Sequence, residues 1–293
     1  MPRDNRLTII AAAVLITICI WAYALLPGRG TLDVTVMDVG EGLCVVVCAP
    51  SGKVMVVDCG TSSWRNSESV GRSVVAPYLH RLGKDSIDVA VLSHPHSDHV
   101  SGYAGLLKVV PAKLVLDIGA KHKSSFYRRF LREARKCGAI YRIAKRGQRI
   151  EMGDGVVVEV LSPAAGEQYS DLNNNAIVLR VVYGKAAIML ATDACDETER
   201  KIMDSCTSLR AQALLVGHHG GRGACSDEWL AAVRPSIAVI SCGRRNYYGH
   251  PSRETVNRLE SSGARVYRTD RDGAITVSTD GRTMRATAFS SAH

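Results

Sequence analysis

Residues 93–99 read Ser93-His94-Pro95-His96-Ser97-Asp98-His99, which places three imidazoles and one carboxylate within six positions. Zinc and similar divalent metals prefer this mixture of nitrogen and oxygen ligands. We therefore interpret the segment as part of a metal site. The alternative is a polar turn whose histidines are hydrogen-bonded within the protein and bind no metal.

The sequence before this segment indicates where the ligands lie. Residues 87–92 form a short, mostly apolar run of the kind that makes a buried β-strand. Pro95 disfavours helical geometry at His94. The predicted ligands therefore lie on a loop at the carboxyl end of a strand, where α/β proteins usually bind their ligands.

Apolar runs and turn residues predict two β-rich halves, each with helices. Early in the chain we expect strands at 32–39, 43–49, 54–57, 87–92 and 114–118, and helices at 70–82, 102–109 and 124–137. Later we expect strands within 139–161 and 176–190 and at 213–216, 236–240, 265–268 and 273–278, with helices at 196–205, 226–233 and 252–262. This pattern favours an α/β fold in which two sheets pack face to face with helices outside, a four-layer αββα sandwich. A single doubly wound sheet is the rival, although hairpins in both halves count against it.

The N-terminal region contains an uncharged run, residues 7–26, that is long enough to span a bilayer. Arg3 and Arg6 precede it, so the positive-inside rule favours a cytoplasmic N-terminus. Ala22-Tyr23-Ala24 also resembles a signal-peptide cleavage site. We expect residues 1–30 to be a single-pass membrane anchor, or a cleaved signal peptide, plus a linker; a core helix is the alternative. Residues 31–288 would then form one domain outside the cytoplasm, at the cell membrane or secreted.

Composition and charge narrow the class of protein. The 293 residues are 46% hydrophobic and 22% charged, which is typical of a globular chain and excludes a disordered one. The formal net charge is +9, and residues 121–149 account for it, with eleven Lys or Arg and one acidic residue, Glu133. Such a segment attracts polyanions. A nucleic-acid groove, a contact with an anionic membrane or wall polymer, and a solvated face all remain open.

A metal centre must collect further ligands from other strand ends. Residues 186–191 form an apolar run that ends in Thr192-Asp193, and residues 213–216 form another that ends in Gly217-His218-His219-Gly220. Asp193 could bridge two metals, and His218 could complete the second site; His219 is the alternative to His218. Asp193 could instead cap the helix that begins near Asp196.

These residues together resemble the metallo-β-lactamase superfamily, and more narrowly the ComEC-type domain of competence DNA-uptake proteins. The resemblance extends from about Leu32 to Ser278. Besides the His-x-His-x-Asp-His segment, Asp193 and the His-His-Gly, it includes Asp38 to Gly42, Asp58-Cys59-Gly60, Asn173 to Asn175, Asn246 to Pro251 and Arg268-Thr269-Asp270.

The resemblance implies a hydrolytic centre with one or two divalent ions, zinc by expectation and manganese as the alternative. His94 and His96 would hold one ion, Asp98, His99 and His218 the other, and Asp193 would bridge. Asp98, Asp193 and His250 are the expected catalytic residues. Asp98 would help to orient the nucleophile if only one ion is present, and His250 would contact the phosphate or protonate the leaving group. A structural histidine beside Pro251 at the start of a helix is the alternative for His250.

The chain departs from the superfamily pattern in one important place. Hydrolases of the superfamily usually supply a third histidine to the first metal from the region that here reads Asp171 to Asn175, and no histidine lies between His122 and His218. The first metal would then be bound weakly or be absent, with an amide of Asn174 or Asn175 nearby. Both asparagines could equally be turn residues.

The combined prediction is a metal-dependent hydrolase, a phosphodiesterase or nuclease that acts on DNA or a related polyanion outside the cytoplasm. We expect substrate contacts from nine residues: Lys121, Lys123, Arg128, Arg129, Asn174, Asn175, His219, Asn246 and His250. A separately encoded uptake channel is the expected protein partner. The alternatives are a DNA-binding accessory module with a degenerate metal site, and a lactam, ester or thioester hydrolase.

Overall fold

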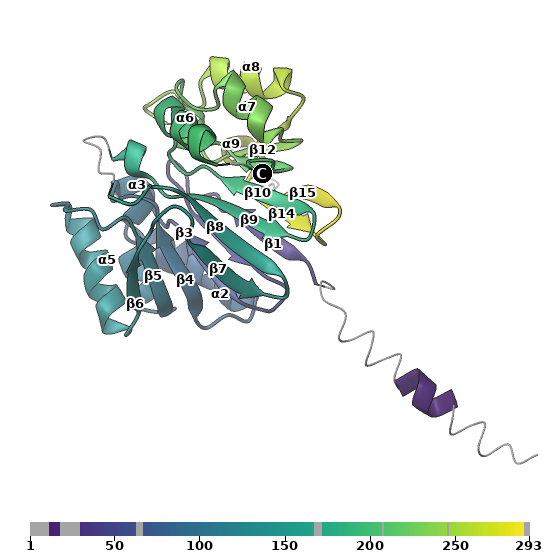
Figure 1. Cartoon of the computed structure of the whole chain (residues 1–293). Coiled ribbons are helices and arrows are strands. Elements are labelled where there is room, and N and C mark those ends of the chain that lie inside the picture. Colours follow the sequence, from purple (N-terminus) through teal and green to yellow (C-terminus); the bar gives the residue numbers. More distant parts are fainter. Residues whose placement is uncertain are drawn as a thin grey trace, which may run out of the picture.

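Two β-sheets pack face to face, and helices cover the outer face of each sheet (Figure 1). The computed structural model describes residues 12–17, 30–62, 67–166, 172–206, 208–244 and 246–289. This arrangement is the predicted four-layer αββα sandwich. The rival prediction, a single doubly wound sheet, is wrong.

The first sheet has eight strands and changes from antiparallel to parallel at its middle. Strands from β15 to β3 are antiparallel to their neighbours, and strands from β3 to β6 are parallel. The spatial order is β15 (Met284–Phe289), β14 (Ala274–Thr279), β1 (Leu32–Val36), β2 (Val45–Cys48), β3 (Val54–Val57), β4 (Ile87–Leu92), β5 (Ala112–Asp117) and β6 (Ile140–Ile143). The strand β15 was not predicted from the sequence, because its residues are mostly exposed and form no apolar run.

The second sheet has seven strands and also changes from antiparallel to parallel pairing. Strands from β7 to β10 are antiparallel, and strands from β10 to β13 are parallel. The order is β13 (Arg265–Arg268), β12 (Ile237–Ile240), β11 (Ala213–Leu215), β10 (Ala186–Leu190), β9 (Val178–Tyr183), β8 (Val156–Ser162) and β7 (Arg149–Gly153).

Helices cover the outer faces. The first sheet carries η1 (Gly71–Val75), α2 (Ala76–Arg81), α3 (Ser97–Val100), α4 (Tyr103–Leu107) and α5 (Ser125–Lys136). The second half contains η2 (Asn173–Asn175), α6 (Asp196–Ser205), η3 (Gly217–Gly220), α7 (Asp227–Val233), α8 (Arg253–Ser261) and α9 (Thr269–Asp272). The predicted helices and strands of the described region all appear, with ends that agree or differ by a few residues.

Three apolar cores hold the layers together. Val45 and Val47 of β2 belong to the core between the sheets, whereas Val46 belongs to the core beneath the helices of the first sheet. This alternation follows from the two-residue period of a strand, and it explains why a strand buried on both faces is apolar throughout. Phe130 of α5 and Trp229 of α7 are buried in the two outer cores.

The predicted membrane segment, residues 7–26, lies mostly outside the described residues, which include only 12–17 of it; those six are helical and exposed. Within the part of the chain that is described, no helix has the length and apolar character needed to cross a bilayer.

Candidate metal centre

The carboxyl ends of neighbouring strands bring the predicted ligands together. His94 follows β4, and His96 immediately precedes α3, which carries Asp98 and His99. Asp193 follows β10, and η3 follows the neighbouring parallel strand β11. The carboxyl ends of parallel strands from both sheets therefore meet at one site, as expected for α/β proteins.

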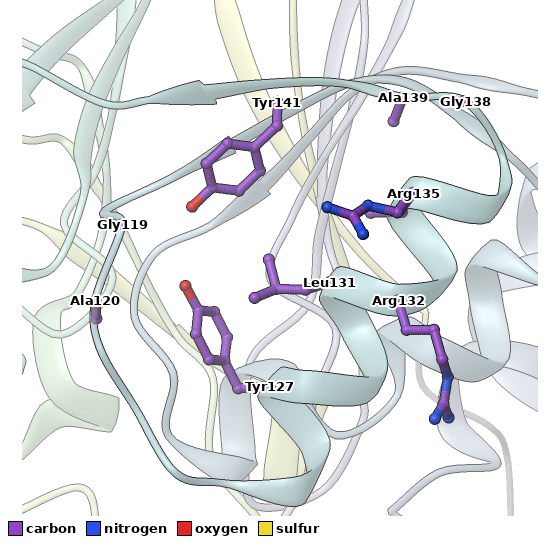
Figure 2. A pocket seen from close by; sticks show the side chains of 10 residues that line it. Gly119, Ala120, Tyr127, Leu131, Arg132, Arg135, Gly138, Ala139 and Tyr141 are labelled. Atoms are coloured by element: carbon purple, nitrogen blue, oxygen red, sulfur yellow. The ribbon is translucent and has the colours of Figure 1, made fainter.

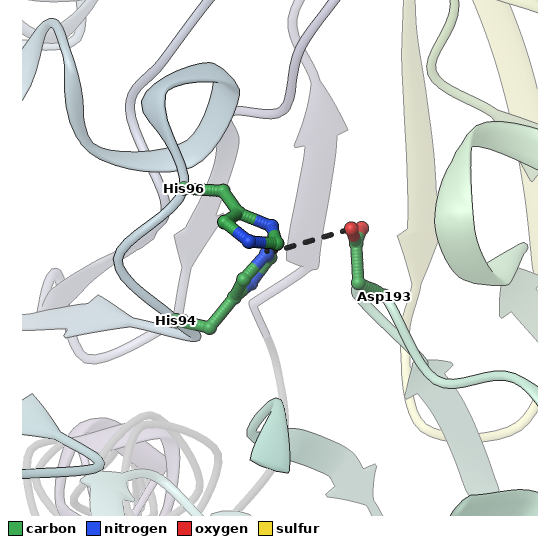
Figure 3. A group of neighbouring side chains, drawn as sticks. All are labelled: His94, His96 and Asp193. Atoms are coloured by element: carbon green, nitrogen blue, oxygen red, sulfur yellow. Dashed lines mark hydrogen bonds and ion pairs between the residues drawn. The ribbon is translucent and has the colours of Figure 1, made fainter. Parts of the chain in front are cut away.

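The first group of potential ligands consists of His94, His96 and Asp193 (Figure 3). The His94 Nε2 and His96 Nδ1 atoms are 2.8 Å apart, and the His94 Nε2 is 3.6 Å from Asp193 Oδ2. His94 and Asp193 are buried, and His96 is partly exposed. Two imidazole nitrogens and one carboxylate oxygen thus face a common point.

The second group consists of Asp98, His99 and His219. Asp98 Oδ2 lies 3.6 Å from His99 Nε2 and 3.3 Å from His219 Nε2. The ligand atoms within each group all lie within 4.8 Å of one another. Both groups therefore have the residue types and the spacing that a divalent cation requires.

Asp193 lies between the two groups, with one carboxylate oxygen toward each. Its Oδ2 faces His94, while its Oδ1 is 3.1 Å from His99 Nε2 and 3.8 Å from His219 Nε2. This orientation would allow the carboxylate to be shared by the two groups.

Unpartnered polar atoms in the second group fit a bound cation. Among the described residues, His99 Nε2, His219 Nε2 and Asp193 Oδ1 are buried and make no well-formed hydrogen bond, although they face one another and Asp98 at 3.1–3.8 Å. Buried polar atoms of native proteins are usually hydrogen-bonded, so three such atoms facing one point fit a site for a ligand. A metal ion at this point would satisfy all three.

The histidines and carboxylates of the site favour each other's charged forms. Although burial opposes it, the nearby Asp193 and Asp58 carboxylates hold the pKa of His99 well above its usual value. The pKa of Asp193 is lowered well below its usual value because His99 and His94 outweigh its burial. A negatively charged Asp193 is the form that binds a cation.

The structure corrects the prediction at the His-His-Gly segment. His219, and not His218, contributes to the second group. Both histidines have left-handed backbone angles, with φ of 47° and 53°, so consecutive side chains leave the turn in different directions. His218 instead places Nδ1 3.3 Å from the Sγ of Cys195 and Nε2 3.5 Å from the amide of Asn173.

A buried carboxylate that the sequence analysis did not assign to the site, Asp58, orients His99. Its Oδ2 accepts a hydrogen bond from His99 Nδ1 at 2.8 Å, and Ser93 donates its N–H and Oγ–H to the same carboxylate. With Nδ1 held by Asp58, Nε2 is the atom of His99 that would bind an ion, which would displace the proton that Nε2 carries in the charged ring. Gly60 allows the close approach, because a Cβ there would lie 2.4 Å from the backbone nitrogen of His99. The available signal was the position of Asp58 directly after a strand.

We expect Asp58→Asn to weaken metal binding and lower activity by about 10- to 100-fold, the usual effect of removing a carboxylate behind a metal-binding histidine. The amide can donate to Nδ1, which favours the tautomer whose Nε2 carries a proton and cannot bind a metal. Metal content by mass spectrometry and kcat/KM measure the effect. Asp85→Asn, at an exposed position, is the matched control, and an unchanged metal content in Asp58→Asn would contradict the prediction.

A cavity of about 320 Å³ opens onto both groups. Of the predicted substrate residues, His219 and His250 line it, and so does Asn173 in place of Asn174 and Asn175. Asn174 donates to Glu197 Oε2 at 2.6 Å, and Asn175 is buried. Neither asparagine lines the cavity, so the cavity gives no support to their predicted substrate contacts, and the alternative that both are turn residues agrees with the structure. The 3-10 turn η2 exposes only the first of the three asparagines to the cavity.

Two further residues of the site have defined partners. Asn246 does not line the cavity; its side chain is hydrogen-bonded to the backbone of Gly243 and His250. Glu41 lines the cavity, with Oε1 3.8 Å from His250 Nδ1. Burial and the neighbouring His218 and His219 lower the pKa of His250 to about 4.

The predicted basic residues differ in their surroundings. Lys121, Lys123 and Arg128 are exposed, whereas Arg129 forms an ion pair with Glu68. Burial lowers the pKa of His96, and His122, between the two lysines, makes a minor further contribution in the same direction. None of these four basic residues is among the described residues that line the metal cavity.

A larger cavity, of about 790 Å³, lies between α5 and β6 and contains none of the candidate ligands (Figure 2). Tyr127 and Tyr141 line it, and their hydroxyls donate to Asp117 Oδ2 at 2.5 and 2.7 Å. Although this cavity is larger, the smaller cavity is the candidate site, because the histidines and carboxylates meet there.

The chain is similar to known proteins in both sequence and fold. A family model described as the metallo-beta-lactamase superfamily matches residues 37–244. The chain is 32% identical to ComE operon protein 3 of Bacillus subtilis (strain 168), over 87% of this chain and 34% of that protein. It is 31% identical to competence protein ComA of Neisseria gonorrhoeae, over 87% of this chain and 35% of that protein. The chain thus spans about a third of the length of these curated relatives.

Among solved structures, the metallo-beta-lactamase fold protein YhfI from Bacillus subtilis superposes with a TM-score of 0.52. The sequence identity is 12%, and the match covers 81% of this chain and 96% of that one. This likeness concerns the fold alone.

Proposed function

Because the chain belongs to the metallo-beta-lactamase superfamily and has ComEC-type competence proteins among its relatives, we propose that it is a metal-dependent phosphodiesterase acting on DNA or a related polyanion. The observation that carries the proposal is the Asp193 carboxylate, which faces one three-residue ligand group with each oxygen. A metal-dependent hydrolase is the class of enzyme that such a site supports.

Divalent ions held by these residues would supply an activated water and stabilise the charge that develops on the phosphate oxygens. His94 and His96 would bind one ion and Asp98, His99 and His219 the other, with Asp193 shared. Asp58 and the Ser241 carbonyl, which accepts from His219 Nδ1 at 3.0 Å, keep both second-group rings oriented.

His250 is positioned for the substrate. Its side chain lines the cavity and is partly exposed, with the His219 ring 6.2 Å away and nearly parallel. From this position it would donate a hydrogen bond to a phosphate oxygen. The exposed Lys121 and Lys123, beside His122, would attract the polyanion toward the cavity.

We also propose that residues 7–26 anchor the chain in the membrane with the catalytic domain outside the cytoplasm, and that a separately encoded channel is its partner. The uncharged run supports the membrane anchor, and the competence proteins among the relatives support a role in DNA uptake. Protease accessibility of the catalytic domain in intact spheroplasts tests it.

The direct test uses the purified full-length chain in detergent. We expect one or two divalent ions per chain by mass spectrometry, and cleavage of DNA with added Zn²⁺ or Mn²⁺ that a chelator abolishes. Less than one ion per chain with intact, salt-sensitive DNA binding would support the binding module instead. Turnover of chromogenic lactams or thioesters without DNA cleavage would support the other hydrolase class.

Replacing Lys121 and Lys123 together with glutamine is expected to weaken DNA binding and to lower the slope of log Kd against log salt concentration by about one for each lysine. Both side chains are exposed, so their charges are available to phosphates. Fluorescence anisotropy at several salt concentrations measures the slope. Arg129→Gln is the comparison: its ion pair with Glu68 already uses the charge, so a smaller change is expected. Equal changes in both variants would contradict the assignment.

A further inference from the structure

Two tyrosines stand exposed at the mouth of the metal cavity. Tyr248 lines the cavity and is 65% exposed, and the adjacent Tyr247 is 98% exposed. Burial of large aromatic side chains is favourable. A pair that is left in solvent beside a candidate active site therefore indicates a ligand-binding surface.

The turn that displays these rings is held in place. Asn246 Oδ1 accepts from the backbone N–H of His250 at 2.7 Å, and its Nδ2 donates to the carbonyls of Gly243 and His250 at 3.0 and 2.5 Å. This is the role that the structure gives to Asn246. Because a side chain closes the turn, the backbone that carries the two rings is held in place before any ligand arrives, which lowers the entropic cost of binding.

The rings continue a column that begins at the metal centre. The rings of His219 and His250 are 6.2 Å apart and 17° from parallel, and those of His250 and Tyr248 are 5.8 Å apart and 24° from parallel. Tyr247 meets Tyr248 edge to face at 6.1 Å. The outer face of this column is therefore an aromatic platform one ring beyond the proposed phosphate contact, His250.

The platform fits a flat, apolar group that lies next to a phosphodiester, and in a nucleic acid that group is the base. In a duplex the bases are stacked within the helix and present only their edges, so they cannot lie on a protein ring. A single strand leaves the base faces available, and stacking on aromatic side chains is the common way in which proteins bind it.

We propose that Tyr248, with Tyr247 at its edge, stacks on a base of a single-stranded nucleic acid next to the phosphate that the centre cleaves. The inference rests on the proposed phosphodiesterase function and adds the strand form of the substrate. Tyr248 acts in binding and positioning, so its removal affects affinity and KM more than kcat.

The test measures binding and cleavage separately. Full-length wild type, Tyr248→Ala and Tyr248→Phe are titrated with a dye-labelled single-stranded oligonucleotide and with an abasic strand of the same length. We expect Tyr248→Ala to weaken binding of the normal strand by about tenfold, because stacking contributes on this scale per base, and Tyr248→Phe to stay within about twofold. Binding of the abasic strand should not respond to either change.

Three outcomes would overturn the inference: no loss of affinity in Tyr248→Ala, an equal loss with the abasic strand, or no binding of single strands by the wild type. Metal-dependent cleavage is assayed on the same samples with added Mn²⁺. Wild type that binds as expected but never cleaves would remove the phosphodiesterase proposal and leave base stacking supported. If the wild type cleaves DNA but Tyr248→Ala weakens binding of the normal and abasic strands equally, base stacking would be ruled out. The phosphodiesterase proposal would then stand.

Discussion

Asp193→Asn is expected to lower kcat/KM for DNA cleavage by on the order of a thousandfold, because one carboxylate serves both ligand groups. The amide retains the volume of the side chain but loses its charge, and one of its two ends becomes an NH₂ group that cannot bind a cation. The loss of negative charge affects both metal sites at once. Metal content should therefore fall together with activity.

The control for this variant lies three residues away. Asp196 is exposed at the start of α6, so Asp196→Asn removes the same charge without touching either group. Metal analysis and steady-state kinetics are measured on both proteins, and circular dichroism establishes that both are folded. Retention of both metals in Asp193→Asn would show that this residue does not bridge, and would leave each group to bind its ion alone.

His219→Ala is expected to reduce activity by at least about a hundredfold, beyond the 10- to 100-fold typical of a residue that only supports a metal ligand. His219 Nε2 faces Asp98 and Asp193 from a buried ring, and removal of the ring leaves the second group with one imidazole. Metal content should decrease by about one ion per chain if two are bound in the wild type.

His218→Ala is the matched comparison, because it changes the same residue type at the adjacent position. His218 contacts Cys195 and Asn173 and belongs to neither ligand group, so we expect a loss below about tenfold. The pair of variants separates the two histidines that sequence alone left open. The reverse order of effects would restore His218 as the ligand and contradict the geometry.

Much of the fold was predictable from local patterns. The apolar run at 87–92 is β4, and the predicted helix at 196–205 is α6, with the same ends in both cases. Strands buried on both faces and helices with one apolar face leave periodic signals that need no tertiary information. The strand β15 has no such signal, because its side chains are largely exposed and only its pairing with β14 makes it a strand.

The candidate site was predictable in part. His94, His96, Asp98, His99 and Asp193 lie in the two ligand groups as the sequence indicated, although whether they bind metal stays a prediction. Within the Asn173–Asn175 turn, only the first residue lines the cavity, whereas the sequence indicated the second and third. A three-residue turn points its side chains in different directions, and which one faces a cavity depends on the neighbouring helix, here through Asn174 and Glu197.

By itself the sequence determined which ligand atoms exist, that they follow buried strands, and that residues 121–149 carry the positive charge. Only the tertiary structure decided that His219 replaces His218, that Asp58 orients His99, and that Tyr248 stands at the mouth of the cavity. The physical reason is that composition and periodicity are local properties of the chain. The direction of a side chain depends on its own backbone angles, and its partners depend on which strands become neighbours in the folded sheet.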